Sequence, residues 1–286
     1  MKNKTVNKSI KIGVIGVGVL GGEIVNKFLK KGYTVFIYDR SEERINLLVD
    51  KGAVKNLSPK EVTKSADFIF DVTPDDVSSR DVWLGTQGIL KGANSNKILI
   101  ISATLSAAWV DELAKICEKA AYNLFDIAIN GGERGFTLLC GGEKVLLNKI
   151  KPVLKVIGTK IWHFGPVGQG VRYKLILNFL QAVHIVGFTQ AISIAKEQQM
   201  DIKKVGKALT VRPGGILTEL IWEIFQYPLD EATFKIGLIT KDLIYAKKLT
   251  KLRRLSLLDA VLEEYKNAIS KGKAKDDWTS IVSMEE

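Results

Sequence analysis

Two polar side chains within an apolar stretch have the types and spacing needed for acid–base chemistry. Lys174 and Asn178 lie four residues apart in the segment GPVGQGVRYKLILNFL, so on a helix they share one face and can reach one small molecule. The residues beside them are mostly Leu, Ile and Phe. Apolar surroundings disfavour a charged amine and lower the pKa of a lysine toward the range of a general acid/base. The alternative is a lysine whose charged end simply extends to solvent.

A glycine-rich turn near the start of the chain has the spacing of a phosphate-binding loop. The segment IGVIGVGVLGGEIV contains G-x-G-x-x-G directly after a predicted strand and at the start of a predicted helix. The first glycine makes a tight turn, the second lets the backbone approach a pyrophosphate, and the third lets helix and strand pack closely. The motif predicts a dinucleotide-binding loop formed by Gly16, Gly18, Val19, Leu20 and Gly21.

Asp39 stands eighteen residues beyond Gly21, at the end of the next predicted strand. An acidic side chain at this point binds the ribose hydroxyls of an adenosine. Its charge repels the 2′-phosphate of NADP, whereas Arg40, the next residue, would attract it. Because the acidic residue comes first, we expect the cofactor to be NAD or NADP, with NAD favoured.

Short apolar runs alternate with helical patterns over the first 165 residues. The runs rich in Val, Ile and Phe predict buried strands at Ile12–Ile15, Thr34–Tyr38, Phe68–Val72, Ile98–Ile101 and Leu124–Ile129. Helical patterns lie between them at Gly22–Lys31, Glu42–Asp50 and Ala107–Ala120. This alternation predicts an α/β fold, a doubly wound parallel sheet of the Rossmann type with helices on both faces.

Beyond Gly165 the strand pattern ends and the chain becomes helical throughout. One long helix is predicted over Val167–Gln199, and further helices over Ile202–Leu209, Ile216–Phe225, Thr233–Leu252 and Leu257–Lys271. We expect an NAD(P)-binding domain at residues 1–165 and an all-α substrate and dimerisation domain at residues 166–286, joined by the long helix. The helices of the second domain are apolar around much of their circumference, which predicts a homodimer or tetramer through this domain.

Composition excludes several other classes of protein. The net charge of +11 is spread along the chain with no basic block interleaved with aromatic residues, which favours a Lys-rich surface over nucleic-acid binding. Two cysteines make a disulfide framework implausible. We expect a cytoplasmic protein without a metal. The apolar segment Leu175–Ala195 contains Asn178, Gln181, His184 and Gln190, which favours a buried helix over a membrane span.

Five motifs occur in order along nearly the whole chain. They are IGVIGVGVLGG near the start, VTPDDV at Val72–Val77, ISATLS at Ile101–Ser106, DIAINGGERG at Asp126–Gly135, and the GPVGQG segment that continues to Lys174 and Asn178; KDL follows at Lys241–Leu243. Together they resemble the β-hydroxyacid dehydrogenase family, which includes 3-hydroxyisobutyrate dehydrogenase and tartronate semialdehyde reductase.

The resemblance implies a role for each matching residue. Lys174 would be the general acid/base, and Asn178 would hold the substrate oxygen or orient the lysine. The backbone at Asn130, Gly131 and Gly132 would bind the substrate carboxylate. The nicotinamide side of the cofactor would lie against Thr73, Pro74 and Thr104, with Lys241 reaching the cofactor and Asp242 bracing the site, paired with Lys174 or a neighbour. The implied activity is an NAD(P)-dependent interconversion of a small hydroxy acid with its oxo acid or semialdehyde.

Three features depart from the family pattern. Asn130 replaces the usual Ser, the segment after Gly132 is several residues shorter, and the usual Asp-x-Ser-Thr strand end reads Ile101-Ser102-Ala103-Thr104. Leu177 replaces the His of the decarboxylating 6-phosphogluconate dehydrogenases, which excludes that activity. Two alternatives stay open: an imine reductase-like enzyme, against which Lys174 argues, and a cofactor-binding module of the same fold without turnover.

Overall fold

The computed structural model describes residues 9–132, 135–211, 216–227, 231–249 and 256–283. The chain divides into two compact units, Met1–Lys174 and Leu175–Glu286, here termed unit 1 and unit 2. The division falls within the long helix α7 (Gln169–Glu197), a few residues beyond the boundary expected at residue 165. The functional assignment of the two expected domains stays a prediction.

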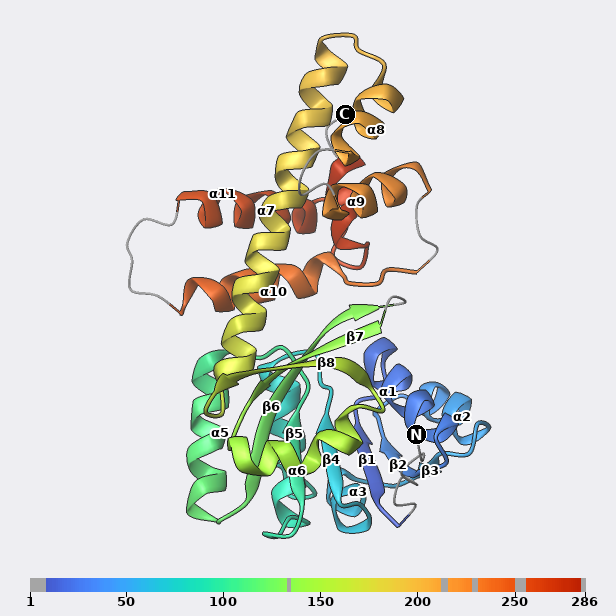
Figure 1. Ribbon diagram of the computed structural model, residues 1–286, viewed down its shortest axis with the longest axis vertical. Coiled ribbons are helices and arrows are strands. Elements are labelled where there is room, and N and C mark those ends of the chain that lie inside the picture. The colour runs from blue at the N-terminus through green and yellow to red at the C-terminus, as the bar shows by residue number, and fades with distance from the viewer. Residues whose placement is uncertain (1–8, 133–134, 212–215, 228–230, 250–255, 284–286) are drawn as a thin grey trace, which may run out of the picture. The chain divides into compact units, whose positions relative to one another are not determined.

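Unit 1 contains an eight-stranded sheet with the order β3-β2-β1-β4-β5-β6-β7-β8 (Figure 1). The strands are β1 (Lys11–Ile15), β2 (Thr34–Tyr38), β3 (Val54–Lys55), β4 (Phe68–Asp71), β5 (Ile98–Ile101), β6 (Asn123–Gly132), β7 (Gly135–Gly141) and β8 (Gly158–Gly165). The five predicted strands are all present, and the expected fold class is confirmed. Neighbouring strands are parallel except for β6 and β7, which are antiparallel. Gly132 pairs with Gly135, and so short a connection can join only antiparallel strands.

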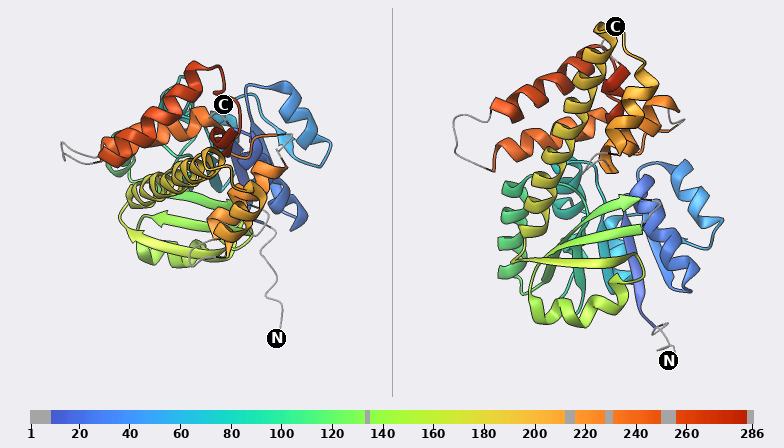
Figure 2. Two further views of the ribbon diagram at one scale, coloured as in Figure 1. Left: turned by 90° about the horizontal axis from the view of Figure 1, so that it is seen from above. Right: turned by 45° about the horizontal axis from the view of Figure 1, so that its top comes forward.

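Helices cover both faces of this sheet (Figures 1 and 2). They are α1 (Val19–Lys30), α2 (Glu42–Val49), α3 (Pro59–Ser65), α4 (Asp76–Leu84), α5 (Ala107–Lys119) and α6 (Lys144–Leu154), with the 3₁₀ turn η1 (Ile89–Lys91). Apolar residues of α1, α2 and α6 form one core with alternate strand residues such as Ile12, Phe70 and Ile127. Several helices begin where a side chain accepts a hydrogen bond from a backbone N–H of the first turn: Ser41, Ser58, Asp75 and Ser106.

Asp71, the last residue of β4, is a fully buried carboxylate on the opposite face of the sheet. It accepts hydrogen bonds from the Thr73 backbone N–H (2.9 Å) and hydroxyl (2.7 Å), the Ser79 hydroxyl (2.8 Å) and the Trp83 indole N–H (2.7 Å). Trp109 of α5 in turn donates to the Ser79 hydroxyl at 3.0 Å. Burial raises the pKa of Asp71, and these donors oppose the rise. The carboxylate therefore ties β4 and α4 together and reaches α5 through Ser79.

Unit 2 consists of the rest of α7 with α8 (Ile202–Thr210), α9 (Ile216–Gln226), α10 (Ile236–Lys247), α11 (Ser256–Ser270) and the 3₁₀ turn η2 (Trp278–Ser283). These elements share an apolar core that includes Ile185, Leu243 and Tyr265. The helix predicted to start at Thr233 begins at Ile236 instead, because the backbone N–H groups of Thr233 and Phe234 donate to the Asp277 carboxylate (2.9 and 3.3 Å). In the described residues of unit 2, every helix or strand element assigned is a helix, as expected.

Of the described residues, only α7 is long and apolar enough to span a membrane by length and composition. Long core helices of soluble proteins pass the same test. Five residues of α7 belong to the buried core of unit 2: Ala182, Ile185, Val186, Phe188 and Ile192. Burial in this core accounts for part of the apolar composition of the helix.

The Asp71 cluster predicts a graded loss of stability. Trp83→Phe removes one donor while keeping an aromatic ring in place, and should lower the free energy of unfolding by about 1–2 kcal/mol. Asp71→Ala leaves four donor groups without their acceptor and should cost at least twice as much. Urea unfolding followed by circular dichroism measures both values. If the free energy of unfolding of the Asp71→Ala protein were as high as that of Trp83→Phe, the proposed contribution of the carboxylate to stability would be contradicted.

Candidate active site

Most of the predicted site residues gather at one edge of the unit 1 sheet. Strands β1, β2, β4, β5 and β6 are mutually parallel, so their carboxyl ends lie on the same side. The glycine loop follows β1, Asp39 follows β2, Thr73 follows β4 and Thr104 follows β5. Asn130 lies in the part of β6 that extends past the end of β5. Ligands of open α/β sheets bind at this edge.

The glycine loop is shaped by close backbone approach. Gly16 has φ +88°, and a Cβ there would stand 2.7 Å from the Val72 carbonyl oxygen. A Cβ on Gly21 would overlap the Gly16 carbonyl oxygen. Gly18 is the N-cap of α1, and a Cβ there would meet only the Arg44 guanidinium, at 4.0 Å. The first turn of α1 therefore presents its N–H groups beside open space, which fits the pyrophosphate of a dinucleotide.

Asp39 connects this loop to the start of α2. Its Oδ2 accepts a hydrogen bond from the Val17 N–H (2.8 Å) and its Oδ1 from the Ser41 N–H (2.9 Å). The Arg44 guanidinium lies 3.9 Å from Oδ1. Arg40, by contrast, is exposed. The carboxylate is therefore held beside the loop, as ribose binding requires.

The segment after β4 is held by the buried carboxylate at the strand end. Asp71 fixes both the backbone and the hydroxyl of Thr73. Thr73 is buried, the next residue, Pro74, is exposed, and Thr104, which follows β5, is half-buried. The sequence motifs indicate Thr73, Pro74 and Thr104 but not Asp71, whose signal is an acidic residue at the end of an apolar strand.

Lys174 contacts Asn130, and both belong to unit 1. The Lys174 Nζ donates to the Asn130 Oδ1 at 3.1 Å, and the lysine is half-buried. An ammonium group has only donors, so the amide oxygen must face it and the Asn130 NH₂ must point elsewhere. Beyond Asn130, Gly131 and Gly132 continue β6 to the hairpin. The structure thus joins the predicted acid/base to the predicted substrate-binding segment.

The start of α7 is attached to unit 1 by two aspartates. Asp126 of β6 is fully buried and accepts from the Gly168 and Val171 N–H groups, both at 2.7 Å. Burial raises its pKa to about 6, against the effect of these N–H donors. At the surface, Arg172 forms a bidentate ion pair with Asp111 of α5 (2.7 and 3.1 Å). Neither aspartate was assigned this role from the sequence.

Asn178 and Lys241 meet at a third aspartate within unit 2. The Asn178 Nδ2 donates to the Asp242 Oδ2 at 2.7 Å, and the Lys241 Nζ lies 2.8 Å from the Asp242 Oδ1. Asn178 and Asp242 are almost completely buried. The carboxylate is an acceptor, so it fixes the amide with its nitrogen toward α10. Both of these contacts lie within unit 2.

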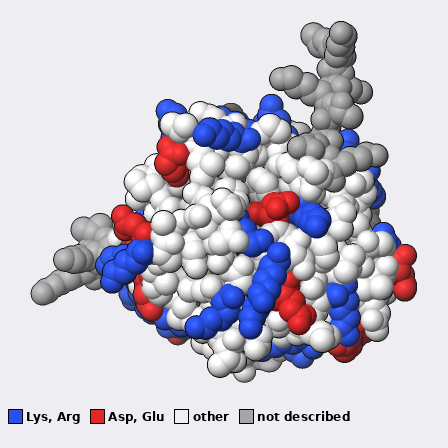
Figure 3. Space-filling view, turned by 90° about the horizontal axis from the view of Figure 1, so that it is seen from below, with Lys and Arg blue, Asp and Glu red and all other residues white. Residues whose placement is uncertain are grey.

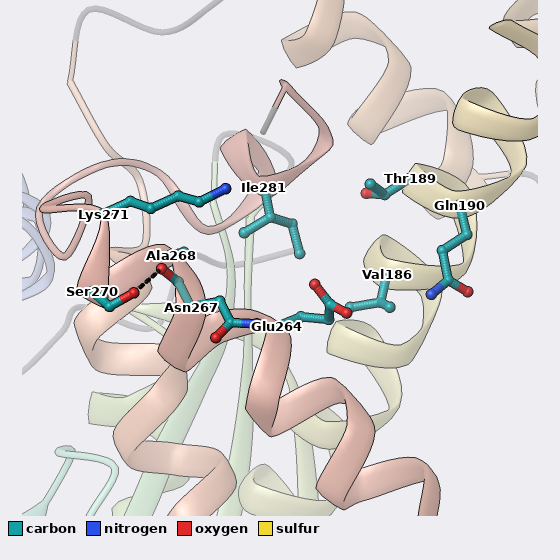
Figure 4. A pocket seen from close by; sticks show the side chains of 9 residues that line it. All are labelled: Val186, Thr189, Gln190, Glu264, Asn267, Ala268, Ser270, Lys271 and Ile281. Carbon is teal, nitrogen blue, oxygen red and sulfur yellow. Dashed lines mark hydrogen bonds between the residues drawn. The ribbon is translucent and has the colours of Figure 1, made fainter. Parts of the chain in front are cut away.

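The surface shows two further features. A depression in unit 2 is lined by α7, α11 and η2, including Thr189, Glu264 and Lys271 (Figure 4), and includes none of the predicted site residues. The face in Figure 3 carries Lys and Arg side chains interspersed with Asp and Glu. Among the residues that the structure describes, no group of three His, Cys, Asp or Glu side chains could hold a metal ion.

Comparison with known proteins identifies the family. Residues 11–165 match the NAD binding domain of 6-phosphogluconate dehydrogenase. A probable mitochondrial 3-hydroxyisobutyrate dehydrogenase of Dictyostelium discoideum is 31% identical over 70% of this chain and 64% of that protein, so the match spans less than two thirds of its length. The chain belongs to the β-hydroxyacid dehydrogenase family. Within this family, the mitochondrial 3-hydroxyisobutyrate dehydrogenase of Rattus norvegicus is 27% identical over 94% of this chain and 85% of its own.

Solved structures share the fold. A 3-hydroxyisobutyrate dehydrogenase from Salmonella typhimurium has a TM-score of 0.84 at 20% identity, over 96% of this chain and 99% of that one. Imine reductase structures from Myxococcus stipitatus, one a variant with NAD+ and one with NADP+, have TM-scores of 0.66 and 0.65 at 20% identity, with the same coverage. At these identities the likeness establishes the fold alone. Family membership confirms the expected enzyme class, an NAD(P)-dependent oxidoreductase of the β-hydroxyacid dehydrogenase type.

Asp39 should set the preference between the two cofactors. Asp39→Ala removes a charged acceptor for the ribose and should weaken NADH binding about tenfold, with a smaller effect on NADPH. Fluorescence titration with each cofactor measures both dissociation constants. Glu43→Ala, which removes an exposed acid from α2, the helix that follows Asp39, is the matched control and should change neither dissociation constant. A wild-type protein that binds NADPH tenfold more tightly than NADH would show that Arg40 dominates instead.

Proposed function

We propose that this protein interconverts a small hydroxy acid with its oxo acid or semialdehyde, using NAD or NADP, with Lys174 as the general acid/base. The observation that carries the proposal is the 3.1 Å contact between the Lys174 Nζ and the Asn130 Oδ1. It lies in the unit whose sheet also holds the glycine loop and Asp39. Family membership supports the same activity.

In the proposed reaction, hydride moves to or from a carbon of the substrate. The oxygen on that carbon must gain or lose a proton at the same time. The bound nicotinamide supplies hydride for reduction of the carbonyl and accepts it in the reverse direction. In reduction, the Lys174 ammonium stabilises the developing alkoxide and gives it a proton. In oxidation, the neutral amine removes the proton from the hydroxyl. Asn178, one helical turn further along α7, is the proposed second ligand of that oxygen.

The proposed carboxylate site is the segment Asn130–Gly132. Backbone N–H groups bind a carboxylate without a charged side chain, and glycines let it approach the main chain. The Asn130 amide, with its oxygen toward Lys174, can direct its NH₂ to the same acid. A small carboxylate with an oxygen-bearing carbon nearby fits these groups, whereas an imine offers no oxygen for the lysine to protonate.

Replacement of Lys174 tests the mechanism. Lys174→Ala should lower kcat by about 10²–10⁴ with small 2-oxo, 3-oxo and semialdehyde acids, while NADH affinity changes less than twofold. Lys174→Arg should not restore turnover, because a guanidinium does not release its proton near neutral pH. Absorbance of the reduced cofactor gives the rates, and fluorescence titration gives the affinities.

A cyclic imine, tested beside these oxo and semialdehyde acids, distinguishes imine reduction from the proposed activity. Near-normal turnover of oxo acids by Lys174→Ala would contradict the mechanism. Turnover of the imine alone would identify an imine reductase instead, and an absence of turnover with every substrate would favour a cofactor-binding module. An equal loss of turnover and of NADH affinity would assign Lys174 a structural role.

We further propose that a second copy of the chain packs along α7. Exposed apolar side chains recur on this helix at intervals that keep them on one face: Tyr173 (36% exposed), Ile176 (56%), Leu180 (53%) and Ile194 (62%). Gly187 lies in the same series, and a Cβ there would meet nothing within 4 Å. The face is uncharged and linear, so the same face of a second copy matches it in length and chemistry.

Charge on this face should dissociate the assembly. Ile176→Glu with Leu180→Glu should shift the mass from a multiple of 31.6 kDa to that of one chain, because a buried unpaired carboxylate is costly. Light scattering coupled to size exclusion measures the mass. Leu57→Glu, at an exposed apolar residue outside α7, is the control and should leave the mass unchanged. A wild-type monomer at micromolar concentration would contradict the proposal.

A further inference from the structure

We propose that Asp126 is a positioning residue for the reaction, whose buried carboxylate fixes the first turn of α7 and thereby holds Lys174 against Asn130. The inference rests on the proposed role of Lys174. It adds a residue of β6 that neither touches the proposed substrate atoms nor belongs to the cofactor loop.

Asp126 replaces the missing hydrogen-bond partners at the start of α7. The first N–H groups of a helix have no acceptor within the helix, and their partial positive charge favours an anion. The Asp126 Oδ1 takes the Gly168 N–H and its Oδ2 takes the Val171 N–H, both at 2.7 Å. Since Asp126 is fully buried, water cannot take over these hydrogen bonds if the helix moves.

Close packing leaves the carboxylate and the helix little room to move. A Cβ on Gly170 would lie 3.0 Å from the Asp126 Oδ2 and would overlap the Leu139 carbonyl oxygen. A Cβ on Gly141, which pairs with Asp126 across β6 and β7, would overlap the Asp126 Oδ1. Two glycines are therefore needed where the turn, the carboxylate and β7 meet.

One face of β6 meets α7 at two points. Asp126 and Asn130 are four residues apart on the strand, so their side chains point to the same side. Asp126 holds the backbone of Val171, and Asn130 accepts from the side chain of Lys174, three residues further along α7. The contact between Asp126 and Val171 fixes the rotation of α7 about its axis and its position along that axis. These two quantities determine where the backbone of Lys174 lies, and therefore what its side chain can reach.

The second anchor of this turn is weaker. The side chains of Arg172 and Asp111 are 28% and 45% exposed, and exposed ion pairs contribute little. The buried Asp126 contacts are shielded from water and salt, so we assign the positioning role to Asp126.

Asp126→Asn tests the inference in the full-length protein. The amide keeps the shape of the carboxylate but places an NH₂ against one of the two backbone N–H groups, so one hydrogen bond is lost. We expect kcat to fall about 10- to 100-fold with the substrate found for wild type, while the NADH dissociation constant stays within twofold. Asp277→Asn, at a buried carboxylate whose contacts are with Thr233, Phe234 and Thr279, is the matched control and should lower stability without this loss of kcat.

A double-mutant cycle separates positioning from a general structural effect. If Asp126 acts through Lys174, adding Asp126→Asn to Lys174→Ala should lower the residual turnover by less than twofold. A full additional 10- to 100-fold loss would overturn the inference, as would normal kcat in Asp126→Asn alone. Should Asp126→Asn not fold, Asp126→Glu keeps both acceptor oxygens but displaces them, and should show the same pattern. Normal turnover in Lys174→Ala would overturn the proposed function itself, whereas an impaired Lys174→Ala with a fully active Asp126→Asn would overturn only the present inference.

Discussion

The parallel pairing of five strands in unit 1 is the constraint on which the rest of the candidate site depends. Parallel strands end on one edge of a sheet, so the segments after β1, β2, β4 and β5 come together although they are far apart in the chain. Strand β6 runs on beyond this edge before it turns back into β7. The edge offers backbone N–H groups and short side chains, which suit phosphates and carboxylates.

Two buried carboxylates stabilise this edge. Asp71 of β4 and Asp126 of β6 both pair with Ile101 of β5, the strand between them, so their side chains lie on the same face of the sheet. Two strand spacings put them about 10 Å apart. Each accepts hydrogen bonds from neutral groups, and burial raises the pKa of both. Two like charges in an apolar layer are tolerable at this separation because each has its own donors. One carboxylate holds Thr73 and the other holds the start of α7.

Local patterns in the sequence were sufficient for part of this arrangement. The glycine loop and Asp39 depend on short-range geometry, and the strand that precedes each is a continuous apolar run, so both could be placed without long-range information. Lys174 and Asn178 share a helix, and their spacing alone puts them on one face. The antiparallel β7 could not be foreseen in this way, because its direction depends on the two-residue connection after Gly132.

Pairings between distant residues were not accessible from spacing. Asn178 and Asp242 are 64 residues apart, and Asp126 and Val171 are 45 apart, so nothing local indicates that they meet. The sequence does contain a weaker signal. Asp71 ends an apolar strand and Asp126 interrupts one, and an acidic side chain buried there requires donors from elsewhere in the fold. Such a residue predicts a long-range partner without identifying it.

The hydrogen bonds of unit 1 give Lys174 a position that does not depend on the later helices. The turn that precedes it is bound to β6 through Asp126, and the Lys174 amine meets β6 again at Asn130. Lys174, the proposed proton donor, and the glycine loop are therefore both attached to one sheet, so a single hydrogen-bonded framework determines their spacing. Asn178, one turn further along α7, has its amide orientation set by Asp242 in unit 2. The helix thus carries two polar groups that are held by different partners. A reaction that exchanges a hydride and a proton needs the first of these to be rigid with respect to the cofactor, and Lys174 is the one fixed to the sheet.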